Sequence, residues 1–185
     1  IALVIGVPLG VYSGLRERAV VAEVSGFFSF FFTAIPGFFL AIIAVFFFAV
    51  RLKWLPATGM HAYDKPNDPV DLAKHLILPA ITLCLFQLTL IMRLVRSEML
   101  EVLRTDYIKF ARARGLTDRA VHFGHALKNT LVPVITITGL QLGGIIAFAI
   151  VTETVFQWPG MGLLFIQSVQ FADIPVMAAY LCLIA

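Results

Sequence analysis

Two histidines, His122 and His125, are three residues apart and would share one face of a helix, as paired metal ligands often do. They supply only two of the three or four protein ligands that a metal centre needs, so we expect no metal site here. The two cysteines, Cys84 and Cys182, lie inside apolar runs. That setting predicts packing or lipid-facing side chains, neither a disulfide nor a metal ligand.

The sequence lacks the usual nucleotide-binding motifs, since it contains no GxxxxGK followed by Ser or Thr and no GxGxxG. No pair of acids falls within an apolar run, which argues against an intramembrane aspartyl protease. Glu153 stands at the end of such a run, where a helix-end or loop contact is favoured over a proton relay. We therefore expect no enzyme activity and no cofactor in this chain, and any ATP hydrolysis must come from a partner.

The composition indicates that lipid is the solvent of this chain. Of its 185 residues 60% are hydrophobic and 14% charged, whereas soluble domains average about 45–50% apolar and about 25% charged. The formal charge of +3 could suggest a nucleic-acid partner, but every Lys and Arg lies between Arg16 and Lys128. This clustering favours membrane lipid as the environment and excludes nucleic acid as a partner.

Three complete membrane spans are expected, because a span needs about 20 apolar residues. The first, Val24 to Val50, has 27 residues without a charge, and Pro36 predicts a kink within it. The second is Leu76 to Met92, with Pro79 in its first turn. The third is Asn129 to Thr152. The fold class is therefore all-α, a polytopic membrane protein.

The two ends of the chain carry shorter apolar runs, 1–15 and 174–185, and each is expected to be half of a span. We accordingly interpret residues 1–185 as a single transmembrane domain, truncated at both ends. Between the first two complete spans, Arg51 to His75 is polar and broken by proline, which predicts a loop with solvated His61 and His75.

Lys and Arg counts orient the spans across the membrane. The segment Arg93 to Lys128 (93–128) holds eight of the fourteen basic residues, and Glu153 to Asp173 (153–173) holds none. Because these segments flank one span, the first is expected in the cytoplasm and the second outside. Arg51 to His75 then falls outside as well, although it carries four basic residues against three acids.

Glycines repeat every fourth residue in two apolar runs, at Gly6, Gly10 and Gly14 and at Gly139 and Gly143. Such spacing lets two helices approach closely within a bilayer. Either repeat could mark a helix or subunit contact, and chance placement is the alternative.

The cytoplasmic segment predicts two helices around a glycine turn. Ser97 can cap the first helix, whose apolar face holds Met99, Val102, Leu103, Tyr107, Phe110 and Ala111. Gly115 can end it in the left-handed conformation, and Thr117 can cap the next helix, which runs toward Asn129. A DNA-binding helix-turn-helix lacks room for its own core here, which leaves a lipid-facing loop or a protein-docking element.

The outer segment has a layout of its own. Pro159-Gly160-Met161-Gly162 predicts a turn, and Leu163 to Phe171 a short apolar helix that is too short to span. We expect this helix at the outer surface or partly re-entrant, where it shapes the exit of a pathway or meets a substrate-binding protein.

Several stretches together resemble the permease subunit of ABC importers, most closely the dipeptide, oligopeptide and nickel branch. They are GVPLGVYSGLRER at 6–18, LKWLPATG at 52–59, DYIKFARARGL at 106–116, HALKNTLVPV at 125–134, ETVFQWPGMG at 153–162 and Asp173-Ile174-Pro175. The resemblance covers essentially the whole chain. It implies a type I permease fold of six spans, a second related permease subunit, two cytoplasmic ATPase subunits and a substrate-binding protein.

In that family a short coupling helix in the cytoplasmic loop docks into a cleft of the ATPase. Carried over, it implies a docking element from Asp106 to Leu116, with Pro133 opening the next span. The general Glu-Ala-Ala motif is absent, and ARARG stands in its place, as in the peptide and nickel branch. The implied ATPase-docking residues are Asp106, Tyr107, Phe110, Ala111, Arg112, Ala113, Gly115 and Leu116, and the structural positions are Pro36, Pro133, Glu153, Pro159, Gly160 and Asp173.

Two further functions compete with an ATP-driven importer of peptides or related small solutes. A secondary transporter or channel would need no ATPase, but its usual intramembrane ionisable residues are missing. A membrane-anchored scaffold is the other alternative, and the basic loop alone could support it.

Overall fold

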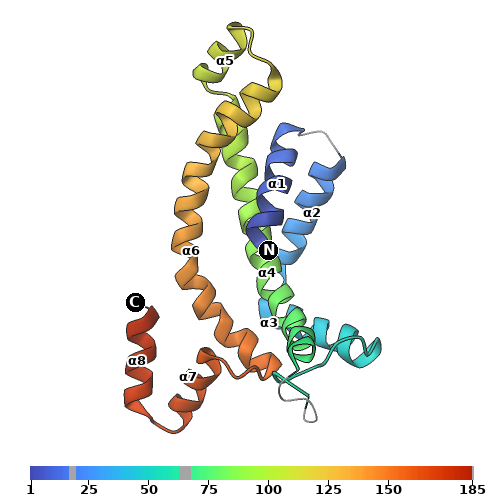
Figure 1. Cartoon of the computed structure of the whole chain (residues 1–185), viewed down its shortest axis with the longest axis vertical. Helices are drawn as coiled ribbons and strands as arrows, with labels where there is room; N and C mark the ends of the chain where they lie inside the picture. Colours follow the sequence, from blue (N-terminus) through green and yellow to red (C-terminus); the bar gives the residue numbers. More distant parts are fainter. Residues whose placement is uncertain (17–19, 63–67, 185) are drawn as a thin grey trace. The chain divides into compact units, whose positions relative to one another are not determined.

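The computed structural model describes residues 1–16, 20–62 and 68–184, and its regular elements within those ranges are all helical. The expected all-α class is confirmed. The elements are α1 (Ala2–Leu15), α2 (Val20–Ala34), α3 (Gly37–Ala44), the π-helix η1 (Val45–Arg51), α4 (Pro69–Leu103), α5 (Asp106–Ala113), the π-helix η2 (Ala120–Ala126), α6 (Leu127–Phe156), α7 (Met161–Gln170) and α8 (Ile174–Ile184) (Figure 1).

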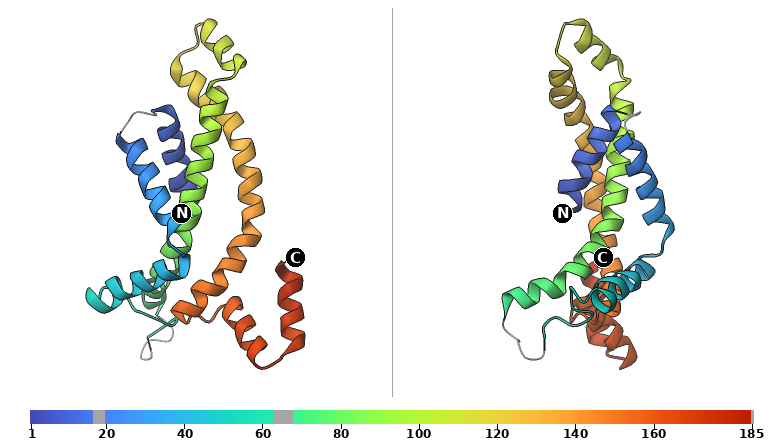
Figure 2. Two further views of the ribbon diagram at one scale, coloured as in Figure 1. Left: turned by 180° about the vertical axis from the view of Figure 1, so that it is seen from behind. Right: turned by 90° about the vertical axis from the view of Figure 1, so that its right-hand side faces the viewer.

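The chain divides into two compact units, each built from two separate stretches. Unit 1 contains Ile1–Ala34 and Leu85–Leu140, and unit 2 contains Ile35–Cys84 and Gln141–Ala185. The boundary between the units falls inside both long helices, so α4 and α6 each contribute one part to each unit. Both helices are drawn as continuous ribbons in Figure 2.

Among the described residues, two helical stretches are long and apolar enough to cross a membrane, α4 with 35 residues and Ala120–Phe156 with 37. The first expected span is instead divided, because α2 ends at Ala34 and α3 begins at Gly37. Pro36 lacks an N–H to continue the helix, and its carbonyl accepts the N–H groups of Phe39 and Leu40 to start α3. The expected kink is thus a complete break, and a third span exists only if both parts count as one.

Helix α4 is much longer than the expected span Leu76 to Met92. Asp68 accepts the N–H of Val70 at 2.9 Å and Pro69 takes the first helical position, so the start signal lies well upstream. Pro79 is therefore inside the helix, and its placement in the first turn was wrong. The expected helix start at Ser97 was also wrong, because nothing in the sequence stops α4 before Leu103.

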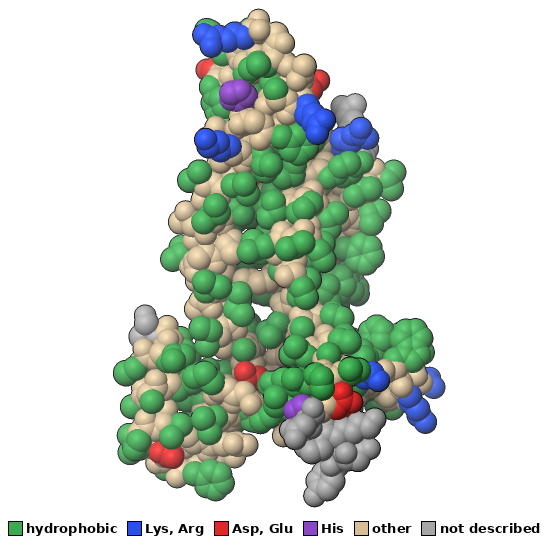
Figure 3. Space-filling view, in the orientation of Figure 1, with side chains coloured by type: hydrophobic (Ala, Val, Ile, Leu, Met, Phe, Trp, Pro, Cys, Tyr) green, Lys and Arg blue, Asp and Glu red, His purple; other side chains and the backbone are tan. Residues whose placement is uncertain are grey.

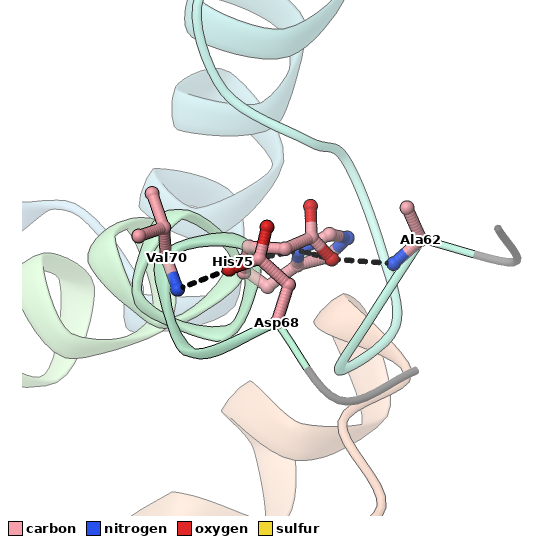
Figure 4. Close-up of polar contacts among 5 residues, drawn as sticks. Ala62, Asp68, Val70 and His75 are labelled. Carbon is pink, nitrogen blue, oxygen red and sulfur yellow. Dashed lines mark hydrogen bonds and ion pairs between the residues drawn. The ribbon is translucent and has the colours of Figure 1, made fainter. Parts of the chain in front are cut away.

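The polar contacts at the start of α4 also correct the expected loop from Arg51 to His75 (Figure 4). An Asp71 carboxylate oxygen accepts the backbone N–H of Ala62 at 2.6 Å, and Nδ1 of His75 lies 2.9 Å from the Asp71 carbonyl oxygen. His75 is buried, so the expectation that it is solvated was wrong. The last part of that segment is helix, because the Asp-Pro start precedes it.

In unit 1, helix α1 packs directly on α4 through its glycine repeat. A Cβ atom on Gly10 would lie 2.6 Å from Cβ of Val95 and 2.8 Å from the Met92 carbonyl oxygen. Gly6 and Gly14 approach the same helix one turn to either side. This repeat is therefore a helix contact within the chain. At Gly139 and Gly143 a Cβ would meet nothing within 4 Å among the described residues.

In unit 2, a small core forms around Ala41, Leu78 and Phe156. The N–H of Gly59 donates to the Phe156 carbonyl oxygen at 2.8 Å, which fastens the loop after η1 to the end of α6. Beyond α6, helices α7 and α8 pack on each other, with the rings of Phe165 and Tyr180 stacked at 4.7 Å. The expected short helix from Leu163 to Phe171 is confirmed, one to two residues earlier in the chain.

Candidate functional site

Helix α5 is a separate two-turn helix between α4 and η2, within the stretch expected to dock a partner. It begins after Thr105, whose extended backbone breaks the path of α4. The hydroxyl of Thr105 donates back to the Val102 carbonyl at 2.6 Å and so leaves the first turn of α5 without a side-chain cap. The single helix expected from Ser97 to Gly115 is therefore two helices, with the break at Arg104 and Thr105.

The end of α5 is fixed by a Schellman motif, in which a left-handed residue lets two later N–H groups close the last turn. Gly115 has a φ of +79°, its N–H donates to Arg112, and the N–H of Leu116 donates to Ala111. The expected glycine turn is confirmed. Thr117 then caps the next helix by accepting the N–H of Ala120 at 3.4 Å, also as expected.

The buried face of α5 differs from the apolar face expected from the sequence. Ile108 is fully buried and Ala111 nearly so, in a cluster with Met99, Val121 and Ala126. Tyr107 and Phe110, assigned to the apolar face, are instead 41% and 68% exposed. The error arose because α5 starts afresh at Asp106, so the helical phase of α4 does not continue through it.

One side-chain contact joins α5 to α6, and a second joins α6 to α4 beneath it. The side-chain amide of Asn129 donates to the Tyr107 hydroxyl at 2.8 Å and to the His125 carbonyl at 3.2 Å. The buried hydroxyl of Thr130 lies 3.4 Å from the Met99 sulfur. Ile108 and Asn129 were missed as site residues. The sequence did hold a signal for Ile108. It is spaced three residues from Ala111, so the two share a helix face, and the charged residues Lys109 and Arg112 follow them on the neighbouring face.

The exposed face of α5 carries both charge and apolar surface. Asp106 and Lys109 form an exposed ion pair at 2.8 Å, and the hydrogen bond and charge of Lys109 lower the pKa of Asp106. Arg112, Ala113 and Gly115 are exposed beside Phe110, and Leu116 is 41% exposed. Lys and Arg side chains gather at the end of the helices where α5 lies (Figure 3). The surface combines an aromatic anchor with cations, as protein-docking sites often do.

The remaining sequence candidates in this region lie on the helical path that follows the Thr117 cap. Pro133 is inside α6, because this path starts well before it, and its role in opening the membrane span stays a prediction. His122 and His125 both lie in η2. Among the described residues, no group of three or more His, Cys, Asp or Glu is placed to hold a metal ion.

In unit 2, Glu153 and the Pro159-Gly160 turn form a second site. A carboxylate oxygen of Glu153 accepts the N–H of Leu163 at 2.9 Å, at the start of α7. A side chain on Gly160 would collide with that carboxyl group, and a Cβ on Gly162 would lie 2.7 Å from the Ile150 backbone. Both glycines are therefore required for the close approach. An acid at a helix N-terminus is favourable, since the free N–H groups and the helix dipole attract negative charge.

Asp173 holds the start of α8 in the same way. Its carboxylate lies 3.4 Å from the Val176 nitrogen, and its backbone N–H donates to the Ser168 carbonyl at 2.8 Å. Asp173 therefore contacts both α7 and α8 and holds the turn between them.

Comparisons with known proteins point to one family. The family described as the binding-protein-dependent transport system inner membrane component matches residues 6–185. The dipeptide transport system permease protein DppB of Alkalihalophilus pseudofirmus is 37% identical, over all of this chain and 61% of that protein. The oligopeptide transport system permease protein AppB of Bacillus subtilis is 40% identical, over 97% of this chain and 57% of that protein.

A third relative, DppB of Escherichia coli K12, is 34% identical over all of this chain and 60% of its own length. The chain thus spans about three fifths of the length of these curated relatives.

Proposed function

Because this chain belongs to the family of binding-protein-dependent transport system inner membrane components, we propose that it is the permease subunit of an ATP-driven importer of peptides or related small solutes. The relatives DppB and AppB are named for dipeptide and oligopeptide transport, which supports peptides as the substrate class. The same family description supports a substrate-binding protein as a partner. A second related permease subunit and two ATPase subunits complete the proposed assembly.

The single observation that carries the docking role is the exposure of Phe110 on a helix whose opposite face is fully buried. Phe110 is 68% exposed, whereas Ile108, two residues earlier, is 0% exposed. Leaving a large aromatic ring in water is unfavourable, and buried aromatic anchors are typical of protein interfaces. We propose that α5 inserts into a cleft of the ATPase, with Phe110 as the apolar anchor and Arg112 as the charged contact.

The contacts behind α5 support a lever between the ATPase and the membrane helices. Movement of α5 would pass through the buried Ile108 to Met99 on α4, and through Tyr107 to Asn129 on α6. Rigid movement of packed elements is a common means of switching between conformations. In this proposal, closure of the ATPase subunits drives the permease between inward-open and outward-open states.

The segment 153–173 is proposed to face the outside, at the exit of the pathway or beneath the substrate-binding protein. A cysteine at Gln157, in a background without Cys84 and Cys182, should react with a membrane-impermeant thiol reagent in intact cells. Labelling that requires lysis would reverse the proposed orientation.

The docking proposal is tested by pull-down of the cognate ATPase subunit with purified variants. Phe110→Ala and Arg112→Glu should each weaken association by about fivefold or more, as loss of an interface anchor does. Phe171→Ala is the matched control, since Phe171 is 82% exposed in the turn after α7. Gly115→Val should also weaken association, because a β-branched residue is strained at a φ of +79°. Equal ATPase recovery for all four variants would refute docking through α5.

A further inference from the structure

Two arginines of α4, Arg93 and Arg96, lie against α2 in unit 1. The guanidinium of Arg93 lies 5.5 Å from the centre of the Phe30 ring. Nη1 of Arg96 is 3.6 Å from the position that a Cβ on Gly26 would take. Because the later arginine faces the earlier residue of α2, the two helices run antiparallel here. Both cations are thus held along one seam between two helices.

These arginines lie at the end of the apolar run of α4 and within about two turns of the ends of those of α1 and α2. The charge-free stretch of α4 ends at Arg93, that of α2 begins after Glu23, and that of α1 ends at Arg16. Helix α1 runs parallel to α4, with Gly10 on Val95 and Gly14 on Met99, so α1 ends about 7–12 Å beyond the arginine pair, toward the same side of the apolar region. Lys and Arg at such a boundary lie beside lipid headgroups. Phe30 is about one helical turn deeper than Gly26 in the apolar region.

Neither arginine has a carboxylate partner among the residues that the structure describes. The positions three and four residues from each arginine on α4 hold no acid, so the usual helical ion pairs are missing. Glu98 and Glu101 lie at other spacings along that helix. On the facing helix, Glu23 is three residues before Gly26, and no ion pair joins it to either arginine. The two positive charges therefore remain available to an external anion.

The surface around the pair favours a lipid over a water-soluble anion. Phe30 and Phe27 on α2 are 70% and 68% exposed, and Arg93 is exposed beside them. Exposed phenylalanines next to a membrane boundary suit acyl chains, whereas a guanidinium fork matches two oxygens of a phosphate group. We propose that Arg93 and Arg96 bind the phosphate of an anionic phospholipid, whose acyl chains lie along Phe27 and Phe30.

The test uses the full-length protein in nanodiscs of phosphatidylcholine containing a minor share of phosphatidylglycerol. Lipids that stay bound after transfer to detergent are counted by native mass spectrometry. The wild-type protein should retain phosphatidylglycerol in preference to phosphatidylcholine, and Arg93→Gln with Arg96→Gln should lower that preference by about fivefold per arginine. Arg93→Lys with Arg96→Lys should keep part of the preference for phosphatidylglycerol, because the positive charges remain while the planar guanidinium is lost.

Arg51→Gln is the matched control, since the Arg51 guanidinium also lies over an aromatic ring, 5.9 Å from the centre of Phe46. That variant should keep the wild-type preference. Excess inorganic phosphate should leave bound phosphatidylglycerol in place if the lipid is the ligand. The proposal is overturned if the double glutamine variant retains as much phosphatidylglycerol as wild type, or if inorganic phosphate displaces it fully. The readout involves neither ATPase nor transport, so it is independent of the proposed function.

Discussion

The side-chain amide of Asn129 on α6 donates a hydrogen bond to the Tyr107 hydroxyl on α5 across 2.8 Å. The same amide also donates to the His125 carbonyl, so both of its hydrogens are used within the chain. The bond is exposed, which limits its contribution to about 0.5–1.5 kcal/mol. It nevertheless joins the proposed docking helix to a helix long enough to cross the membrane.

Removing this bond should weaken the proposed lever and leave the proposed docking surface intact. Tyr107→Phe keeps the ring and loses only the hydroxyl, so ATPase pull-down should stay near wild type while less substrate is transported per ATP hydrolysed. The measurement is transport and ATP hydrolysis in the same proteoliposomes. Wild-type coupling in both Tyr107→Phe and Asn129→Ala would show that the bond transmits nothing.

Truncating a side chain on the buried face of α5 should destabilise the protein, whereas truncating one on the exposed face should not. Ile108→Ala leaves a cavity in the cluster with Met99 and Val121, which should lower the free energy of unfolding by about 2–4 kcal/mol. Phe110→Ala, on the exposed face, should change it by less than about 0.5 kcal/mol. Thermal unfolding of the purified protein, with hydrogen exchange of the α5 amides, measures both. Similar destabilisation by the two variants would contradict the assignment of the faces.

The contact between Glu153 and Leu163 should determine the stability of the first turn of α7. Glu153→Ala leaves the Leu163 N–H without its acceptor, and Gly160→Ala pushes the carboxylate away. Both should speed hydrogen exchange at the start of α7, whereas Glu153→Gln keeps an acceptor oxygen and should give an intermediate rate. The cap contributes about 1 kcal/mol, which corresponds to about a fivefold change in exchange. An unchanged exchange rate in Glu153→Ala would show that Glu153 does not stabilise the first turn of α7.

The ion pair of Asp106 and Lys109 predicts the pH range in which the stability of α5 depends on pH. The pKa of Asp106 is lowered from its ordinary value of 3.8, chiefly by the hydrogen bond and charge of Lys109. A lowered carboxyl pKa stabilises the folded helix above pH 3.8, and this contribution is lost as the pH falls through the folded value. An NMR titration of Asp106 should show the shift in wild type and its loss in Lys109→Ala. Identical titration curves would contradict the pairing.

In the segment 93–128, local signals predicted the structure well where one residue determined one feature. Gly115 was identified as the turn because only a residue tolerant of positive φ fits there, and Thr117 because its hydroxyl can cap a helix. Pro36 was likewise identified as an interruption, although one missing N–H does not reveal whether a helix bends or stops. The resemblance of the whole chain to one transport family was also visible in the order of its motifs.

Features that depend on helical phase could not be predicted. Tyr107 and Phe110 were assigned to an apolar face because the pattern was followed through Thr105, where the chain actually begins a new helix. Ser97 was mistaken for a cap because serine is also tolerated inside a helix. The partners of Gly10, Asn129 and Glu153 lie 10 to 85 residues away in sequence, and no local pattern encodes such contacts.

Site-specific crosslinking tests the central proposal most directly. In a variant lacking Cys84 and Cys182, a single cysteine replaces Phe110 or, as the control, Phe171, and the protein is purified together with its ATPase subunits. A short bifunctional thiol reagent should join the Phe110→Cys variant to an ATPase cysteine placed in its cleft, and Phe171→Cys should give no such product. An intact complex that crosslinks through position 171 and not through position 110 would contradict the account.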